Sequence, residues 1–228
     1  MENLQDEIRE IRKQLRLAMN GVISTSMREK GIVYKLNFGV AYPEIKEIAH
    51  KHQAGTALAS ALWKEDIREF KILAGFLQPV EEFAEEEALR WVNEIPYMEI
   101  AECSCKNLFV HLPYLESFTA RLIADQDGTF ARAVAFLTWT EFFRRQGRLS
   151  DELTDMFLKE SFVSLGSVEA SLNEKHAAVQ SLKFYGRQSK EKGKTVLSRF
   201  DELRKTVKSS SELEEIYDEL KFEFEYYQ

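Results

Sequence analysis

Apolar side chains recur every three or four residues along most of this chain, the spacing that places them on one face of an α-helix. The opening segment is a clear case, with apolar residues at Leu4, Ile8, Ile11, Leu15 and Met19. Gly21 is expected to end this helix, because glycine is favoured just beyond a helix C-terminus. No run of residues has the alternating pattern of a β-strand, so the sequence predicts an all-α fold.

Further helices are predicted by the same spacing and by the residues that separate the apolar runs. One begins at Pro43, a favoured first helical position, and breaks at Gly55. The next covers 57–76 and is ended by Pro79. The remaining helices are predicted at 83–94, 97–111, 114–124, 128–145, 150–160, 168–187, 194–207 and 211–226.

The connections between these helices are too short for domain linkers, so residues 1–228 are predicted to form a single domain. A weak repeat relates residues 63–74 to residues 127–137, because each has a helix start, an arginine and an apolar run. The two arginines, Arg68 and Arg132, lie 64 positions apart, which fits two repeats of about 32 residues. Helix pairs at this period predict an α-solenoid of antiparallel helix pairs.

The charge balance limits the kind of nucleic-acid contact that the chain can make. Of its 228 residues, 38 are acidic and 31 are Lys or Arg, which gives a formal net charge of -7. This balance disfavours a protein that coats nucleic acid through bulk charge, but it is compatible with a local basic face.

Cysteine usage and the N-terminal segment bear on the compartment and on metal binding. Cys103 and Cys105 are the only cysteines, so no disulfide framework is expected and a cytoplasmic location is predicted. The N-terminal segment is charged throughout, and no stretch reaches about 18 uncharged apolar residues, so no membrane association is expected. Together with His111, the two cysteines are too few and too poorly spaced for a zinc site. Neither a metal nor a cofactor is expected.

Two motifs follow each other early in the chain. The first is Phe38-Gly39-Val40-Ala41-Tyr42-Pro43-Glu44-Ile45-Lys46-Glu47-Ile48-Ala49, and the second combines Leu62-Trp63, Arg68-Glu69 and Leu73-Ala74. They resemble the Phe-Gly-Val-x-x-Pro-x-Leu-Arg-x-Ile-Ala and Leu-Trp-x(4)-Arg-Glu-x-x-x-Leu-Ala elements of the DNA alkylation repair enzyme family. Members of that family are alkylpurine DNA glycosylases built from HEAT-like helical repeats. The resemblance implies HEAT-like helix pairs over most of residues 20–207.

The resemblance also implies a reaction, cleavage of the N-glycosidic bond of an N3- or N7-alkylated purine. A carboxylate near the sugar would stabilise the positive charge that develops on the deoxyribose and orient the attacking water. Residues 98–102 are similar to the family's Trp-Asp-x-x-Asp segment, so Glu102 is the candidate catalytic residue. This segment departs from the family pattern, because Met98 replaces a tryptophan and Glu102 carries one more methylene than aspartate. The candidate substrate-contacting residues are Tyr97, Met98, Phe184 and Tyr185.

Double-stranded DNA is the expected partner, and cations on the later helices are the candidate contacts to its backbone. These candidates are Arg132, Arg144, Arg145, Arg148, Arg187 and Lys190. Residues 183–208 hold nine Lys or Arg against three acids, which makes them the best electrostatic candidate for DNA contact. The alternative is ordinary salt bridging on helix surfaces, and for Arg68 a structural pairing with Glu65 or Glu69 is an equal alternative.

The C-terminal segment reverses the sign of the charge. Residues 212–228 contain seven acids against Lys221. Residues 211–228 are therefore predicted to form an acidic and aromatic capping helix, because a solenoid end needs a polar outer face. The alternative is a segment that folds back on the basic stretch and blocks the DNA surface. A different function also stays open, a catalytically degenerate scaffold that binds a protein or an undamaged, branched or single-stranded nucleic acid.

Overall fold

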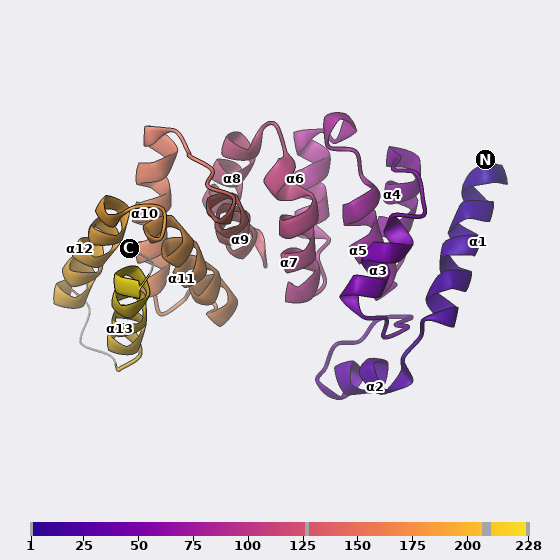
Figure 1. Cartoon of the computed structure of the whole chain (residues 1–228), viewed down its shortest axis with the longest axis horizontal. Helices are drawn as coiled ribbons and strands as arrows, with labels where there is room; N and C mark the ends of the chain where they lie inside the picture. Colours follow the sequence, from indigo (N-terminus) through magenta and orange to yellow (C-terminus); the bar gives the residue numbers. More distant parts are fainter. Residues whose placement is uncertain (1, 126–127, 207–210, 227–228) are drawn as a thin grey trace. The chain divides into compact units, whose positions relative to one another are not determined.

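The computed structural model describes residues 2–125, 128–206 and 211–226. Figure 1 shows these ranges as helices joined by short connections, and the only β-type pairing among them is an isolated bridge between Leu36 and Ile67. The predicted all-α fold is confirmed. Of the helices, repeats and charged stretches predicted above, residues 127, 207, 208, 227 and 228 lie outside the described ranges.

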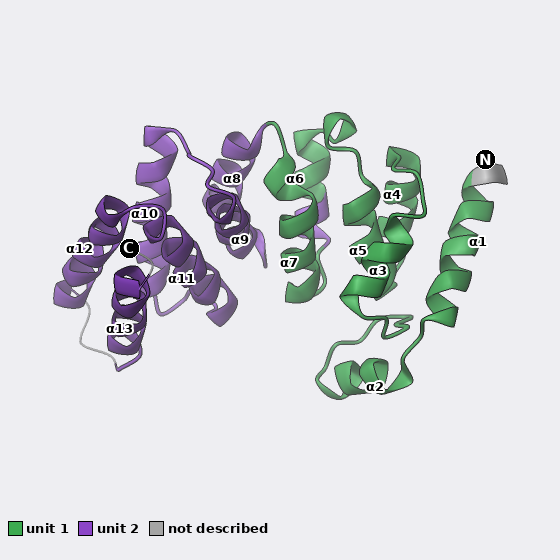
Figure 2. Cartoon of the chain, in the orientation of Figure 1, with its two compact units in different colours: residues 1–90, 95–113 green, residues 91–94, 114–228 purple. Residues whose placement is uncertain are grey.

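The chain divides into two compact units (Figure 2). Unit 1 contains residues 1–90 and 95–113, and unit 2 contains residues 91–94 and 114–228. Each unit has its own buried aromatic side chains, such as Trp63 in unit 1 and Trp139 in unit 2. The organisation of residues 1–228 as one domain stays a prediction.

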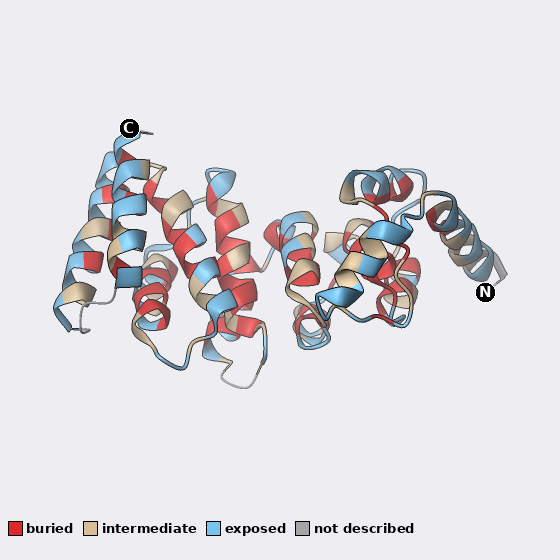
Figure 3. Cartoon of the chain, turned by 90° about the horizontal axis from the view of Figure 1, so that it is seen from below, coloured by how far each residue is buried: buried red, intermediate tan, exposed pale blue. Residues whose placement is uncertain are grey.

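Unit 1 is built around α5, which packs against α3, α4 and α7. Its elements are α1 (Glu2–Leu17), α2 (Gly21–Glu29), α3 (Tyr42–Ala49), α4 (Thr56–Trp63), α5 (Arg68–Leu77), η1 (Val80–Glu82), most of α6 (Glu85–Asn93), α7 (Met98–Asn107) and η2 (Phe109–His111). Figure 3 shows buried positions concentrated on the helix faces that meet other helices. Trp63, Phe70 and Phe109 are fully buried there, as expected for large aromatic residues at helical spacing.

The start of the chain differs from the prediction at Gly21. The first helix ends at Leu17, and Gly21 begins α2 rather than closing α1. Asn20 provides the reason, because its side-chain oxygen accepts hydrogen bonds from the backbone N–H groups of Val22 and Ile23 at 3.1 and 3.2 Å. An asparagine in this position caps a new helix.

The helix predicted over 57–76 is wrong as a single element, because the structure divides it into α4 and α5. Ile67 has an extended backbone, with φ −128° and ψ 120°, and forms the bridge with Leu36. The backbone N–H of Lys35 donates to the Asp66 carboxylate at 2.8 Å, and that of Leu36 donates to the Asp66 carbonyl at 3.3 Å. Contacts with a distant loop thus replace helical hydrogen bonds at the break.

Unit 2 is built around α11, which packs against α9, α10, α12 and α13. Its helices are α8 (Leu115–Ala124), α9 (Ala131–Arg144), α10 (Asp151–Gly166), α11 (Leu172–Gly186), α12 (Lys190–Thr206) and α13 (Ser211–Tyr226). The predicted boundary near 160–168 is shifted, because α10 continues to Gly166 and the Ser171 hydroxyl caps α11 by accepting from the Glu174 N–H at 3.2 Å.

The C-terminal helix α13 packs against both α11 and α12. Leu213, Leu220 and Phe224 form its buried face. A Cβ atom at Gly186 of α11 would lie only 2.3 Å from a ring carbon of Phe224, so glycine allows the two helices to approach closely. The role of residues 211–228 as a cap stays a prediction.

Within the described residues, none of the helices combines the length and the apolar character needed to span a membrane.

Candidate functional site

A buried ion-pair network holds α5, α7 and the loop before α3 together in unit 1. The fully buried Glu69 carboxylate accepts hydrogen bonds from the backbone N–H groups of Phe38 (3.1 Å) and Val40 (3.2 Å) and from Arg68 (2.9 Å). Arg68 also donates to the Val40 carbonyl at 2.9 Å and to both carboxylate oxygens of Glu99 at 2.6 and 2.9 Å. These partners compensate the burial of the charges.

The two sequence motifs therefore contact each other in space. The segment Phe38-Gly39-Val40 wraps around the carboxylate of Glu69, and Gly39 makes this possible with a φ of +68°. The predicted alternative for Arg68, pairing with Glu69, is confirmed, and its second acidic partner is Glu99 rather than Glu65. Arg68 is thus a structural residue, and the motif pair defines the local fold of unit 1.

Glu102, the candidate catalytic residue, lies exposed on α7, one turn after Glu99. It makes no hydrogen bond or ion pair with any described residue. Partial burial raises the pKa of its carboxyl, and the negative charge of Glu99 adds to this effect. The Arg68 guanidinium is fully used by Glu99, Glu69 and Val40, so Glu102 is the carboxylate of this helix face that is available to a ligand.

The two candidate residues before Glu102 are half-buried. The Tyr97 hydroxyl donates a hydrogen bond to the Val33 carbonyl and accepts one from the Val33 backbone N–H, both at 2.9 Å. Its ring packs edge-on against Tyr34, with centroids 5.0 Å apart. Met98 is the first residue of α7. Tyr97 therefore presents its ring, not its hydroxyl, to any ligand at this position.

The two cysteines lie on the same helix as Glu102. Cys105 is buried, and burial together with the negative charge of Glu99 raises the pKa of the Cys103 thiol to about 12. A thiol with so high a pKa carries almost no thiolate at neutral pH, and thiolate is the form that attacks or binds a metal. In the described ranges, His, Cys, Asp and Glu do not gather in a group of three or more that could hold a metal ion.

Arg132 lies in a second ion-pair network, in unit 2. Its guanidinium donates to Glu174 at 2.7 Å, to Glu160 at 3.2 Å, to the Ser164 hydroxyl at 2.9 Å and to the Ile123 carbonyl at 2.8 Å. These contacts join α9 to α10 and α11. A phosphate contact by Arg132 stays a prediction, and it would have to displace these partners.

Phe184 is flanked by two arginines. The guanidinium of Arg144 lies 4.4 Å from the centre of its half-buried ring, and that of Arg187 lies 4.8 Å from it. Cations over an aromatic face are attracted to it. The arrangement brings the last residue of α9 beside the end of α11 and presents two guanidinium groups around one ring.

Gln188 links the two turns that carry the remaining candidate cations. Its side-chain amide donates to the carbonyls of Phe143 (3.1 Å) and Gly147 (3.0 Å), and its oxygen accepts from Lys192 at 2.7 Å. Burial and the nearby positive charge of Arg148 lower the pKa of the Lys192 ammonium. The turn after α9 and the turn before α12 are thus tied together.

These observations define a cationic cluster in unit 2. It consists of Arg144, Arg148, Arg187 and Lys192, together with Lys190, which begins α12 two residues before Lys192. Arg148 and Lys190 are exposed and form no ion pair with a described residue. The sequence did not single out Lys192 as a site residue. Its hydrogen bond to Gln188, a contact made by folding, places it in the cluster. Glu141 pairs with Arg144 at 3.4 Å and with Arg145, the neighbouring candidate, at 2.7 Å.

Tyr185, the other aromatic candidate, is buried in the core of unit 2. Its ring packs against Phe143 and Phe157, with centroids 5.2 and 5.3 Å apart, and Lys192 lies 4.6 Å from its ring centre. Of the aromatic pair 184–185, Phe184 is therefore the residue that lies next to the cationic cluster at the surface.

The candidate residues belong to different units. Tyr97, Met98 and Glu102 lie in unit 1, whereas Phe184, Tyr185 and all six predicted backbone contacts lie in unit 2. Within unit 2, Arg132 lies in a separate ion-pair network and Tyr185 in the core, whereas Phe184 lies between Arg144 and Arg187. A single site formed by both groups stays a prediction.

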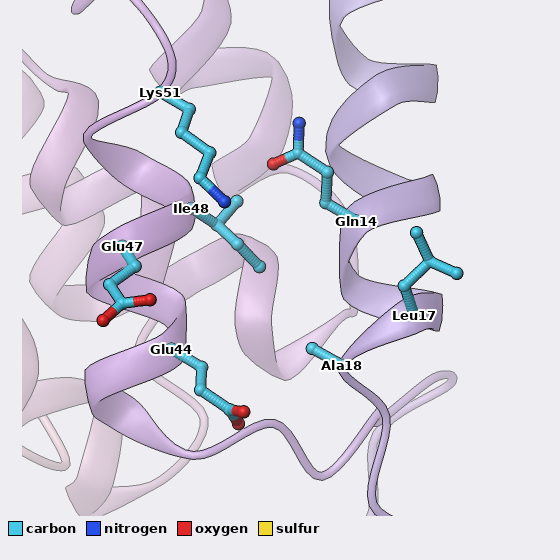
Figure 4. A pocket seen from close by; sticks show the side chains of 7 residues that line it. All are labelled: Gln14, Leu17, Ala18, Glu44, Glu47, Ile48 and Lys51. Carbon is cyan, nitrogen blue, oxygen red and sulfur yellow. The ribbon is translucent and has the colours of Figure 1, made fainter.

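An open hollow in unit 1 is separate from all of these residues (Figure 4). It is lined by Gln14, Leu17, Ala18, Glu44, Glu47, Ile48 and Lys51. Figure 4 shows Glu44 and Glu47 of α3 and Lys51, which follows this helix, on one side of the hollow, and Gln14 and Leu17 of α1 on the other. The hollow holds none of the predicted site residues.

Comparison with known proteins assigns the family. The family model for the DNA alkylation repair enzyme matches residues 11–181. This match covers well over half of the chain, so the chain belongs to the DNA alkylation repair enzyme family. Among curated proteins, no sequence matches it.

A solved structure has a similar fold. It represents "a new family of proteins related to the HEAT-like repeat DNA glycosylases with affinity for branched DNA structures". The similarity has a TM-score of 0.76 at 15% sequence identity and covers 94% of each chain. The predicted α-solenoid of HEAT-like helix pairs is confirmed.

Proposed function

We propose that this protein binds DNA, and that the cationic cluster of unit 2 contacts the phosphate backbone. The observation that carries the proposal is the pair of guanidinium groups, Arg144 and Arg187, over the partly exposed Phe184. The two turns that carry the other cations of the cluster are linked next to it by Gln188. Cations that neutralise phosphates release counterions, which makes binding favourable and salt-dependent. The chain's net charge of -7 requires such a local cluster, because bulk charge repels DNA.

Phe184 adds a second kind of contact to this surface. An aromatic face can stack on a base or pack against a sugar, and neighbouring arginines add cation–π attraction and phosphate binding. Family membership supports DNA as the ligand. Titration of labelled duplex DNA, followed by fluorescence anisotropy at several salt concentrations, tests the proposal. We expect binding that weakens steeply with salt, and the absence of binding at low salt contradicts the proposal.

Excision of an N3- or N7-alkylated purine is the reaction that we propose for this family member, with Glu102 as the acting carboxylate. Glu102 is exposed and unpaired on α7, whereas Glu99 is held by Arg68. An alkylated purine is a cation and leaves readily, so the carboxylate needs only to stabilise the positive sugar and orient water. The anionic form does this work, and the raised pKa means that protonation removes it at a higher pH than for an ordinary glutamate.

Replacement of Glu102 with glutamine is expected to lower the rate of N7-methylguanine release by about a hundredfold or more, because the charge on the group is lost. The measurement is free base released from methylated duplex DNA. Glu65→Gln is the matched control, since Glu65 is an exposed carboxylate of the same unit without a partner among the described residues. Release that persists in Glu102→Gln at the rate of the control assigns catalysis to another group.

A second candidate function is binding of undamaged, branched DNA without excision. The similar solved structure favours it, because that protein family is described as having affinity for branched DNA structures. The two functions separate in one comparison of methylated duplex, unmodified duplex and a four-way junction. Base release supports excision, tight junction binding without release supports the second function, and binding to neither supports a scaffold for a protein partner.

A further inference from the structure

The acidic helix α13 is joined to α11 by ion pairs as well as by its apolar face. The Lys183 ammonium lies 2.5 Å from a carboxylate oxygen of Glu223 and 3.2 Å from one of Glu219. The Arg187 guanidinium binds the other oxygen of Glu223. One carboxylate thus bridges two cations four residues apart, Lys183 in the last turn of α11 and Arg187 directly after it.

These pairs are partly shielded from solvent, so their charges interact more strongly than those of exposed pairs. The side chains of Lys183, Arg187 and Glu223 are 15%, 21% and 14% exposed. Burial alone disfavours ionisation of Glu223, but hydrogen bonds from Lys183 and Arg187 outweigh it and lower the pKa of the carboxyl. Burial likewise opposes the charge on Lys183, and its bonds to Glu223 and Glu219 outweigh it and raise the pKa of the ammonium.

The bridged cations are continuous with the cationic cluster. Arg187 is at once a partner of Glu223 and one of the two guanidinium groups over Phe184, and Phe184 directly follows Lys183 in the sequence. Lys and Arg are the side chains that bind nucleic-acid phosphates, and here the two lie next to an aromatic ring and share one anion. Here a carboxylate of the same chain holds them.

We propose that Glu219 and Glu223 occupy Lys183 and Arg187 in the place of DNA phosphates, so that α13 is a built-in competitor for DNA. The inference deepens the proposed function and rests on it. The ligand with which these two carboxylates compete is a pair of phosphates of the DNA backbone. For DNA to use Lys183 and Arg187, the α11–α13 ion pairs have to break. The affinity of the intact protein for DNA is therefore lower than it would be if these two cations were unpaired.

Glutamine substitutions test this better than truncation does. Removal of α13 would also uncover the apolar residues beneath Leu213, Leu220 and Phe224 and could unfold the unit. The double variant E219Q/E223Q keeps side-chain size while removing both charges. We expect its affinity for duplex DNA to rise about tenfold. The slope of log affinity against log salt concentration should steepen by about two, because two more phosphates are neutralised.

The matched control is E215Q/D218Q, which removes two charges from the same helix. Glu215 and Asp218 are exposed and form no ion pair within the described part of the chain. We expect the control to change affinity only slightly, through net charge, and to leave the salt slope unchanged. Equal affinities and equal slopes in the two double variants overturn the inference.

The failure of this inference is distinguishable from the failure of DNA binding itself. If the wild type binds DNA through the cationic cluster, but E219Q/E223Q behaves like E215Q/D218Q, only the competitor role is contradicted. If neither the wild type nor E219Q/E223Q binds DNA at low salt, the proposed function and the inference are both contradicted. Thermal unfolding of each variant, measured in parallel, shows that affinities are compared between folded proteins.

Discussion

Replacement of Arg68 with alanine is expected to lower the free energy of unfolding by about 3–5 kcal/mol, the cost of breaking a buried ion pair on one side. Arg68 supplies the charge that balances the fully buried Glu69, and it binds both oxygens of Glu99. Without it, Glu69 keeps only the backbone N–H groups of Phe38 and Val40. Urea denaturation followed by circular dichroism measures the loss.

The control for Arg68→Ala is Arg9→Ala, which breaks an exposed pair. The Arg9 side chain is 77% exposed and bonds Asp6 three residues away at 2.6 Å. Such pairs contribute at most about 0.5 kcal/mol. Equal effects of the two substitutions would contradict the structural role of the network. The loss of unfolding free energy in Arg68→Lys should lie between those of the two alanine variants, because lysine keeps the charge but not the bidentate contact with Glu99.

Replacement of Gly39 with alanine is expected to destabilise the protein by about 3–4 kcal/mol, near the upper end for single substitutions. A Cβ atom there would lie 2.1 Å from the Asn20 carbonyl oxygen and 2.8 Å from the Ser24 nitrogen, both backbone atoms that cannot swing away. The φ of +68° adds the strain of a left-handed conformation. Moving the loop instead would pull the N–H groups of Phe38 and Val40 from Glu69.

Gly31 provides a matched control for Gly39. It also has a positive φ, +83°, but an added Cβ would meet nothing within 4 Å. Gly31→Ala should therefore cost only the conformational strain, about 1–2 kcal/mol. The difference between the two midpoints of thermal unfolding isolates the steric clash. A loss at Gly31 as large as that at Gly39 contradicts the close packing of this loop.

The helical class was predictable from the sequence because helical periodicity is a local property of apolar spacing. The break within 57–76 was not, because Lys64 and Glu65 fit the polar face of a continuous helix as well as a turn. What ends α4 and starts α5 is the pairing of Asp66 and Ile67 with a loop about thirty residues earlier. Non-local contacts of this kind leave no periodic signal.

The candidate site was predictable in parts for the same reason. The local excess of Lys and Arg and the reversal of charge after residue 211 identify a basic surface and an acidic helix. The arrangement of Arg144 and Arg187 around Phe184 depends on how α9 packs on α11. Likewise, only the packing of α13 shows that Glu223 is the carboxylate that bridges two cations.

The salt dependence of DNA binding tests the central claim, that the cationic cluster contacts the phosphate backbone. The variant R144Q/R148Q/K190Q removes three exposed cations of the cluster, and K30Q/K46Q/K64Q removes three exposed lysines elsewhere. We predict that the cluster variant loses about ten- to a hundredfold in affinity at 0.1 M salt, with a salt slope shallower by about three. The lysine control should stay near the wild type. Equal affinities and equal slopes for the two triple variants would contradict the account.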